Sequence, residues 1–109
     1  MEPTDHPLLL KLGPARYDRE PAQLLWPCPL SQEEALVAAP LLMASLECTL
    51  GPVEQGADRL YWPLEFEGTA LSLQYEALCD SLWIQAGEGG DTEGDQVVAF
   101  LARLAGASV

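Results

Sequence analysis

Apolar and polar residues alternate along the chain between Arg59 and Ala86, and two turn signals divide this stretch into three parts. A period of two predicts β-strands with one apolar face. Glu67-Gly68 has the form of a two-residue hairpin loop, whose backbone twist suits antiparallel flanking strands. Residues 77–80 (Ala-Leu-Cys-Asp) give a second turn. We therefore expect a three-stranded antiparallel meander.

The first turn fixes which residues lie opposite one another. It places Phe66 opposite Thr69, and from there the large apolar residues of both strands share one face. The expected further pairs are Leu64 with Leu71, Trp62 with Leu73, Leu60 with Tyr75, Tyr75 with Leu82, Leu73 with Ile84 and Leu71 with Ala86. A slip of one residue would turn the apolar set to the other face, so this agreement supports the register.

Prolines dominate the first thirty residues, which hold six of the nine in the chain. Each proline disfavours helix in the residue before it, so extended segments are expected. Leu8 to Leu12 and Gln23 to Trp26 could form short strands that add to the meander. Alternatively, a proline-rich arm lies over the core, anchored by Leu8, Leu10, Leu24 and Trp26. The expected organisation is an N-terminal arm over residues 1–30 and a single α+β domain over residues 31–109.

A helix is predicted to begin after Ser31, because Ser31-Gln32-Glu33-Glu34 is a capping box. Its apolar face is expected from Leu36, Val37, Leu41, Leu42, Met43, Leu46 and the intervening alanines. The interior Pro40 predicts either a kink near Val37 or a second helix that begins at Pro40. The element should end near Cys48, and residues 49–54 are expected to be a short strand before a turn over 55–58.

A second helix is predicted near the C-terminus. Thr92 with Asp95 resembles another capping box, and Gly106 is a fitting residue just past the helix end. Apolar residues recur at helical spacing at Val97, Val98, Leu101, Leu104 and Ala105. The order helix, meander, helix predicts an α+β fold: an antiparallel β-meander of three or more strands with two helices packed on one face.

The register also predicts a second face on the meander, and this is the candidate binding site. Tyr61, Gln74 and Trp83 form a cross-strand row there, with Pro63 and Gln85 beside it. Aromatic residues with a polar tip are enriched at protein interfaces, so these five residues are expected to bind a protein partner or a second copy of the chain. The alternative is that the N-terminal arm covers the row.

Pro63 adds a second possible mode of binding. Proline cannot donate a hydrogen bond to a neighbouring strand, so the first meander strand is expected to be a sheet edge. Such an edge could accept a strand from another chain, although Glu65 and Glu67 discourage uncontrolled pairing.

The net charge of the chain limits the classes of partner that it can bind. The chain has 17 acidic and 5 basic residues, a net charge of −12. Such a field repels phosphate backbones and anionic lipid, so we expect neither direct nucleic-acid binding nor membrane binding. The acidity serves solubility, or it allows the chain to mimic an anion on a basic nucleic-acid-binding surface.

Candidate chemistry is sparse. Three widely spaced cysteines and one histidine, His6, form no recognisable metal or nucleophile motif. Asp91-x-Glu93-x-Asp95 alternates like a calcium loop, but Gln96 stands where that loop needs glycine and Ala102 where it needs glutamate. We therefore predict no catalytic residue, no metal, no cofactor and no small-molecule substrate. Reduced thiols and the lack of a long apolar run predict a soluble, cytoplasmic protein.

Three segments carry a resemblance to a known family: Gly56-Ala57-Asp58-Arg59, Leu64-Glu65-Phe66-Glu67-Gly68 and Asp80-Ser81-Leu82-Trp83-Ile84. They resemble a family of short acidic bacterial proteins known only as a domain of unknown function. The resemblance covers roughly the second half of the chain and implies a bacterial cytosolic protein, with no catalytic residue carried over.

Type III secretion chaperones are similar in size, acidity and α/β makeup, and they dimerise to bind an effector segment. They open with a helix, however, and lack an uninterrupted meander. The leading hypothesis from the sequence is a non-enzymatic protein-interaction module, with an anion mimic or a chaperone-like dimer as alternatives.

Overall fold

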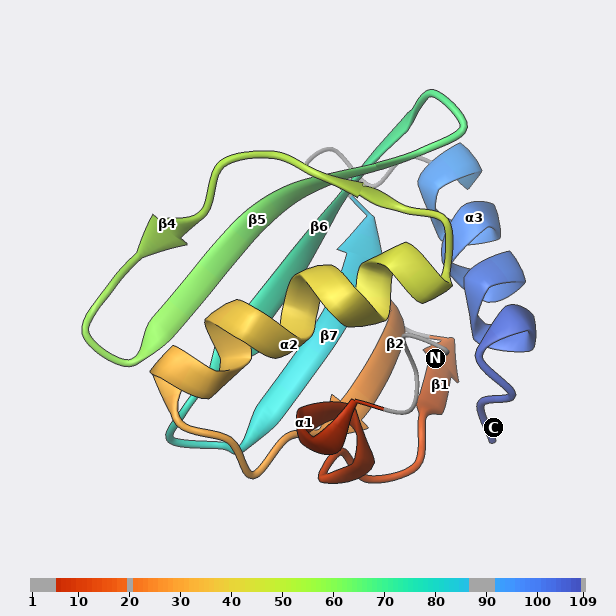
Figure 1. Cartoon of the computed structure of the whole chain (residues 1–109). Coiled ribbons are helices and arrows are strands. Elements are labelled where there is room, and N and C mark those ends of the chain that lie inside the picture. Colours follow the sequence, from red (N-terminus) through yellow and green to blue (C-terminus); the bar gives the residue numbers. More distant parts are fainter. Residues whose placement is uncertain (1–5, 20, 87–91, 109) are drawn as a thin grey trace.

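An antiparallel sheet forms the centre of the computed structural model, which describes residues 6–19, 21–86 and 92–108 (Figure 1). The strand order is β1-β2-β7-β6-β5-β3, and β4 also pairs with β5. The strands are β1 Arg16–Arg19, β2 Ala22–Pro27, β3 Thr49–Leu50, β4 Glu54–Gln55, β5 Arg59–Phe66, β6 Thr69–Glu76 and β7 Ser81–Ala86. The helices are α1 Pro7–Leu10, α2 Gln32–Ser45 and α3 Thr92–Leu104.

The predicted meander is confirmed as β5, β6 and β7, with every expected cross-strand pair in place. The first turn has positive φ at both central residues, 48° at Glu67 and 84° at Gly68. These are the signs that a type I′ hairpin turn requires. Because the turn fixes the register, it also fixes which side chains face the core.

The proline-rich segment contributes β1 and β2 to the same sheet. The strand expected over Gln23 to Trp26 lies within β2, which pairs with β7. The strand expected over Leu8 to Leu12 is wrong, because Pro7 to Leu10 form the short helix α1. Proline suits the first turn of a helix, where its missing N–H has no partner to lose. His6 supports the same turn by accepting a hydrogen bond from the Leu8 N–H at its Nδ1 atom, at 3.1 Å.

Helices α2 and α3 both pack on the apolar face of the sheet, as predicted (Figure 1). The capping box at the start of α2 is confirmed, with Ser31 and Glu34 bonding reciprocally. α2 is a single helix through Pro40, so the second helix expected to begin there is wrong. Pro40 lies on the exposed side, where water can bond the carbonyl group that loses its helical partner.

Small residues of α2 form part of its buried side. Ala35, Ala38 and Ala39 are buried, whereas Val37, expected on the apolar face, is 51% exposed. In α3, Val98 and Leu101 are buried as expected, but Leu104 is 52% exposed. α3 ends at Leu104, and Gly106 follows just past the helix end, as predicted, with a φ of 69°.

Pro63 does not make β5 a sheet edge, which corrects the expectation. Instead β3 and β4 pair with β5 on its outer side, on either side of Pro63. The Pro63 carbonyl accepts from the Gly51 N–H at 2.7 Å, so its nitrogen, which cannot donate, faces the same outer side. The missing donor explains why the expected strand over residues 49–54 is split into two short pieces.

Candidate protein-interaction surface

The side chains of β2, β5, β6 and β7 that point away from the helices form a continuous surface, here called the open face. Its members come from two adjacent cross-strand rows: Leu25, Trp83, Gln74 and Tyr61 in one, and Gln23, Gln85, Ser72 and Pro63 in the other. Ser72 is covered by its larger neighbours and is only 3% exposed. All five residues predicted to bind a partner are thus brought together. No helix in the described ranges packs on this side.

The described part of the N-terminal arm, residues 6–19 and 21–30, does not cover the open face. Leu24 and Trp26, expected as anchors of the arm, point to the opposite side and are 0% and 5% exposed in the core. Leu25 lies between Leu24 and Trp26 in β2, so its side chain points to the open face. It pairs with Trp83 of β7 and widens the surface. Sequence reasoning missed Leu25 and Gln23, since no turn signal links β2 to the meander.

Hydrogen bonds between side chains order this surface. The Trp83 Nε1–H donates to the Gln85 Oε1 at 2.9 Å, and the Gln23 Nε2 donates to the same oxygen at 3.2 Å. The Gln74 Nε2 donates to the Ser72 Oγ at 3.2 Å. These bonds restrain the rotamers of the amides and of the indole ring. A surface ordered before binding loses less conformational entropy on association.

Charged residues surround the open face but do not enter its centre. Arg59 pairs with Glu76 at 3.0 Å along one margin, and Arg16 pairs with Asp18 at 3.7 Å along another. Near β5, Glu54 of β4 lies opposite Tyr61, and Glu65 lies opposite Ala70 of β6. The eight central residues carry no charge in a chain of 17 acidic residues. A charge-depleted aromatic centre with a polar rim is the usual anatomy of a protein interface.

Reactive groups are absent from this surface and sparse elsewhere in the described ranges. Burial raises the pKa of both the Cys28 and the Cys48 thiols to about 11, so both are protonated at neutral pH and are poor nucleophiles. The exposed Cys79 donates to Glu76, which raises its pKa as well. Among the residues described, no three His, Cys, Asp or Glu side chains gather as metal ligands; Asp91 of the calcium-like segment lies outside them.

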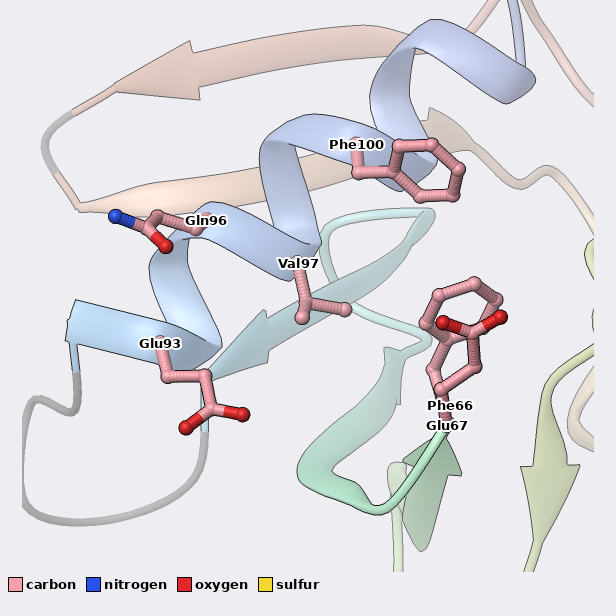
Figure 2. Close-up of a pocket in the computed structure, with 6 residues that line it drawn as sticks. All are labelled: Phe66, Glu67, Glu93, Gln96, Val97 and Phe100. Atoms are coloured by element: carbon pink, nitrogen blue, oxygen red, sulfur yellow. The ribbon is translucent and has the colours of Figure 1, made fainter.

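A groove lies on the helix-covered side of the sheet, between the β5–β6 turn and α3 (Figure 2). This hairpin–α3 groove has a volume of about 210 Å³ and is lined by Phe66, Glu67, Glu93, Gln96, Val97 and Phe100. The rings of Phe66 and Phe100 are 5.7 Å apart between centroids. Sequence reasoning missed the groove because Phe100 falls outside the main apolar stripe of α3.

Comparisons with known proteins place the chain in a family without assigning an activity. No curated protein and no solved structure matches it. No helix in the described part of the chain is long and apolar enough to cross a membrane. A family model described as "Protein of unknown function (DUF3630)" matches residues 12–106. Because this match covers most of the sequence, the chain belongs to the DUF3630 family.

Proposed function

We propose that this protein is a non-enzymatic protein-interaction module that acts through the open face, and that the occupant of this face is a second copy of the chain. The observation that carries the proposal is the uncharged centre around Tyr61, Gln74 and Trp83. Two chains of net charge −12 repel each other strongly wherever carboxylates would meet. The open face is where they can approach with the least repulsion, because carboxylates lie only at its rim.

The size of the surface suits self-association. The molecule measures 33 × 30 × 23 Å along its principal axes. One face of a body of this size can bury the ~800 Å² per partner of a standard interface. Two-fold dimers are the commonest oligomers, and they require one self-complementary patch. The amides of Gln23, Gln74 and Gln85 supply both donors and acceptors, so the patch can bond to its own copy.

We also propose that the protein is located in a bacterial cytosol and that it is not an enzyme. A bacterial cytosol is supported by the segment resemblance described above and by three free cysteines, Cys28, Cys48 and Cys79. A non-enzymatic role is supported by the raised pKa values of the thiols.

Light scattering over a hundredfold concentration range tests the proposal. We expect a dimer that dissociates on dilution, and Trp83→Ser should remain monomeric with an unfolding midpoint close to that of the wild type. The matched control is Val37→Ser, which removes an exposed apolar side chain from α2 on the other side of the molecule and should still dimerise. If Trp83→Ser unfolds, Trp83 belongs to the core; if it dimerises normally, the open face is not the interface.

Salt separates this proposal from anion mimicry. Rim carboxylates of two copies repel, so raising NaCl from about 50 mM to about 500 mM should tighten self-association. An anion mimic would bind a basic surface, and its complexes would weaken steeply over the same range. Self-association that weakens with salt would contradict the dimer proposed here.

A further inference from the structure

We propose that the hairpin–α3 groove binds a basic, partly apolar segment of a partner protein, with one arginine or lysine side chain seated in it. The groove offers two kinds of wall. Phe66, Val97 and Phe100 form an apolar surface, and Glu67 and Glu93 bring carboxylates to its edge (Figure 2). Arginine and lysine combine an apolar stem with a cationic head, so they match both.

The charges around the groove favour a cation. No lysine or arginine is among its six lining residues. Glu93 accepts a hydrogen bond from the Thr69 Oγ1 at 3.2 Å, which ties its carboxylate to the hairpin side of the groove. Arg103 contacts the lining: its guanidinium carbon lies 5.9 Å from the centroid of the Phe100 ring. That contact shows that this ring accepts a cation on its face.

The size of the groove limits the occupant to a side chain and its neighbours. At about 210 Å³ it is smaller than the 300–1,000 Å³ of typical small-molecule pockets. The exposed side chains of Phe100 and Leu104 continue an apolar strip along α3 beyond it. A short segment with an apolar residue next to its basic one would cover that strip.

The backbone at Glu67 offers a way to separate fold stability from binding. Its φ of 48° lies in the left-handed region, where asparagine, aspartate and glycine are favoured in this turn type. A glutamate there is strained by its backbone conformation, while its carboxylate borders the groove. Replacing Glu67 by asparagine should therefore stabilise the fold while weakening the site, which a merely structural residue would not do.

The test is an NMR titration of the isotope-labelled full chain with a peptide of alternating leucine and arginine, acetylated and amidated. We expect saturable shifts in the β5–β6 turn and along α3. A peptide with glutamine in place of arginine should cause none of them. The dissociation constant should rise at least about threefold in Glu67→Gln, in line with the loss of one charge partner. Phe100→Ser should weaken binding as well.

The matched control is Glu65→Gln, which removes the same charge two residues away on the open face. Its affinity for the peptide should equal that of the wild type. Equal weakening by Glu65→Gln and Glu67→Gln, shifts spread over the whole acidic surface, or no saturable shifts would each overturn the proposal. The result is independent of dimerisation, because the groove lies on the other side of the sheet and the dimer is read from mass.

Discussion

The two faces of one sheet differ sharply in what they do. On the covered face, Leu73 and Ile84 are fully buried beneath α2 and α3. On the open face, Gln74 and Trp83 alternate with them along the same strands and remain partly accessible. Since both faces share one backbone, the difference comes only from side chains at alternate positions. The covered face holds the fold together, and the open face is the one that we propose binds a second copy of the chain.

The largest predicted contrast is between adjacent residues. Leu73→Ala should lower the free energy of unfolding by about 3 kcal/mol, because it leaves a cavity in the centre of the covered face. Gln74→Ala, one residue later on the open face, should change it by less than about 0.5 kcal/mol. Urea denaturation of the two variants measures both. Equal losses would mean that the open face is also structural.

A buried hydrogen bond gives a smaller effect on the covered face. The Tyr75 hydroxyl donates to the Leu30 carbonyl at 2.6 Å, beneath the segment that leads into α2. Tyr75→Phe should cost about 1–2 kcal/mol, because the carbonyl is left without its partner. Thermal unfolding gives the value, and Tyr61→Phe on the open face is the matched control with almost no expected loss. A stable Tyr75→Phe would show that water replaces the hydroxyl.

Relief of strain at the hairpin tip should act in the opposite direction. Glu67→Asn places the residue that type I′ turns favour before Gly68, so the fold should gain about 1 kcal/mol. The denaturation midpoint should rise. A fall would show that Glu67 makes stabilising contacts that outweigh its backbone strain.

The smallest effect concerns the start of α2. The pKa of Glu34 is lowered from its ordinary 4.5, first by the hydrogen bond it accepts from the Ser31 backbone N–H and then by the Lys11 ammonium, 3.5 Å away. A carboxyl whose pKa is lowered by folding stabilises above its unfolded pKa and loses that contribution as the pH falls through the folded one. Glu34→Gln should be less stable at neutral pH, and the gap in urea midpoint should close in acid. A gap independent of pH would contradict this.

Much of the sheet was predictable because local signals fixed it. The turn at Glu67-Gly68 and the alternating pattern together determine the register, and with it the row of Tyr61, Gln74 and Trp83. The capping box likewise located α2. These features depend on residues close together in sequence.

What could not be predicted depends on long-range pairing. Nothing local indicates that β2 joins β7, so Leu25 was not expected beside Trp83. The groove could not be predicted for the same reason. Phe66 and Phe100 lie 34 positions apart in the sequence and meet only when α3 packs near the hairpin. At Pro7 the local rule was read in the wrong direction, because proline begins a helix as readily as it interrupts one.

The most direct test of the account is the solution mass of Gln74→Glu beside the wild type, measured over the same concentrations. This change replaces the side-chain amide by a carboxylate of nearly the same shape and so places a negative charge at the centre of the open face. We predict that the wild type dimerises and that Gln74→Glu stays monomeric at every concentration, with an unchanged unfolding midpoint. A wild type that is monomeric throughout, or a Gln74→Glu dimer as tight as the wild type, would contradict the claim that the uncharged face is the binding surface.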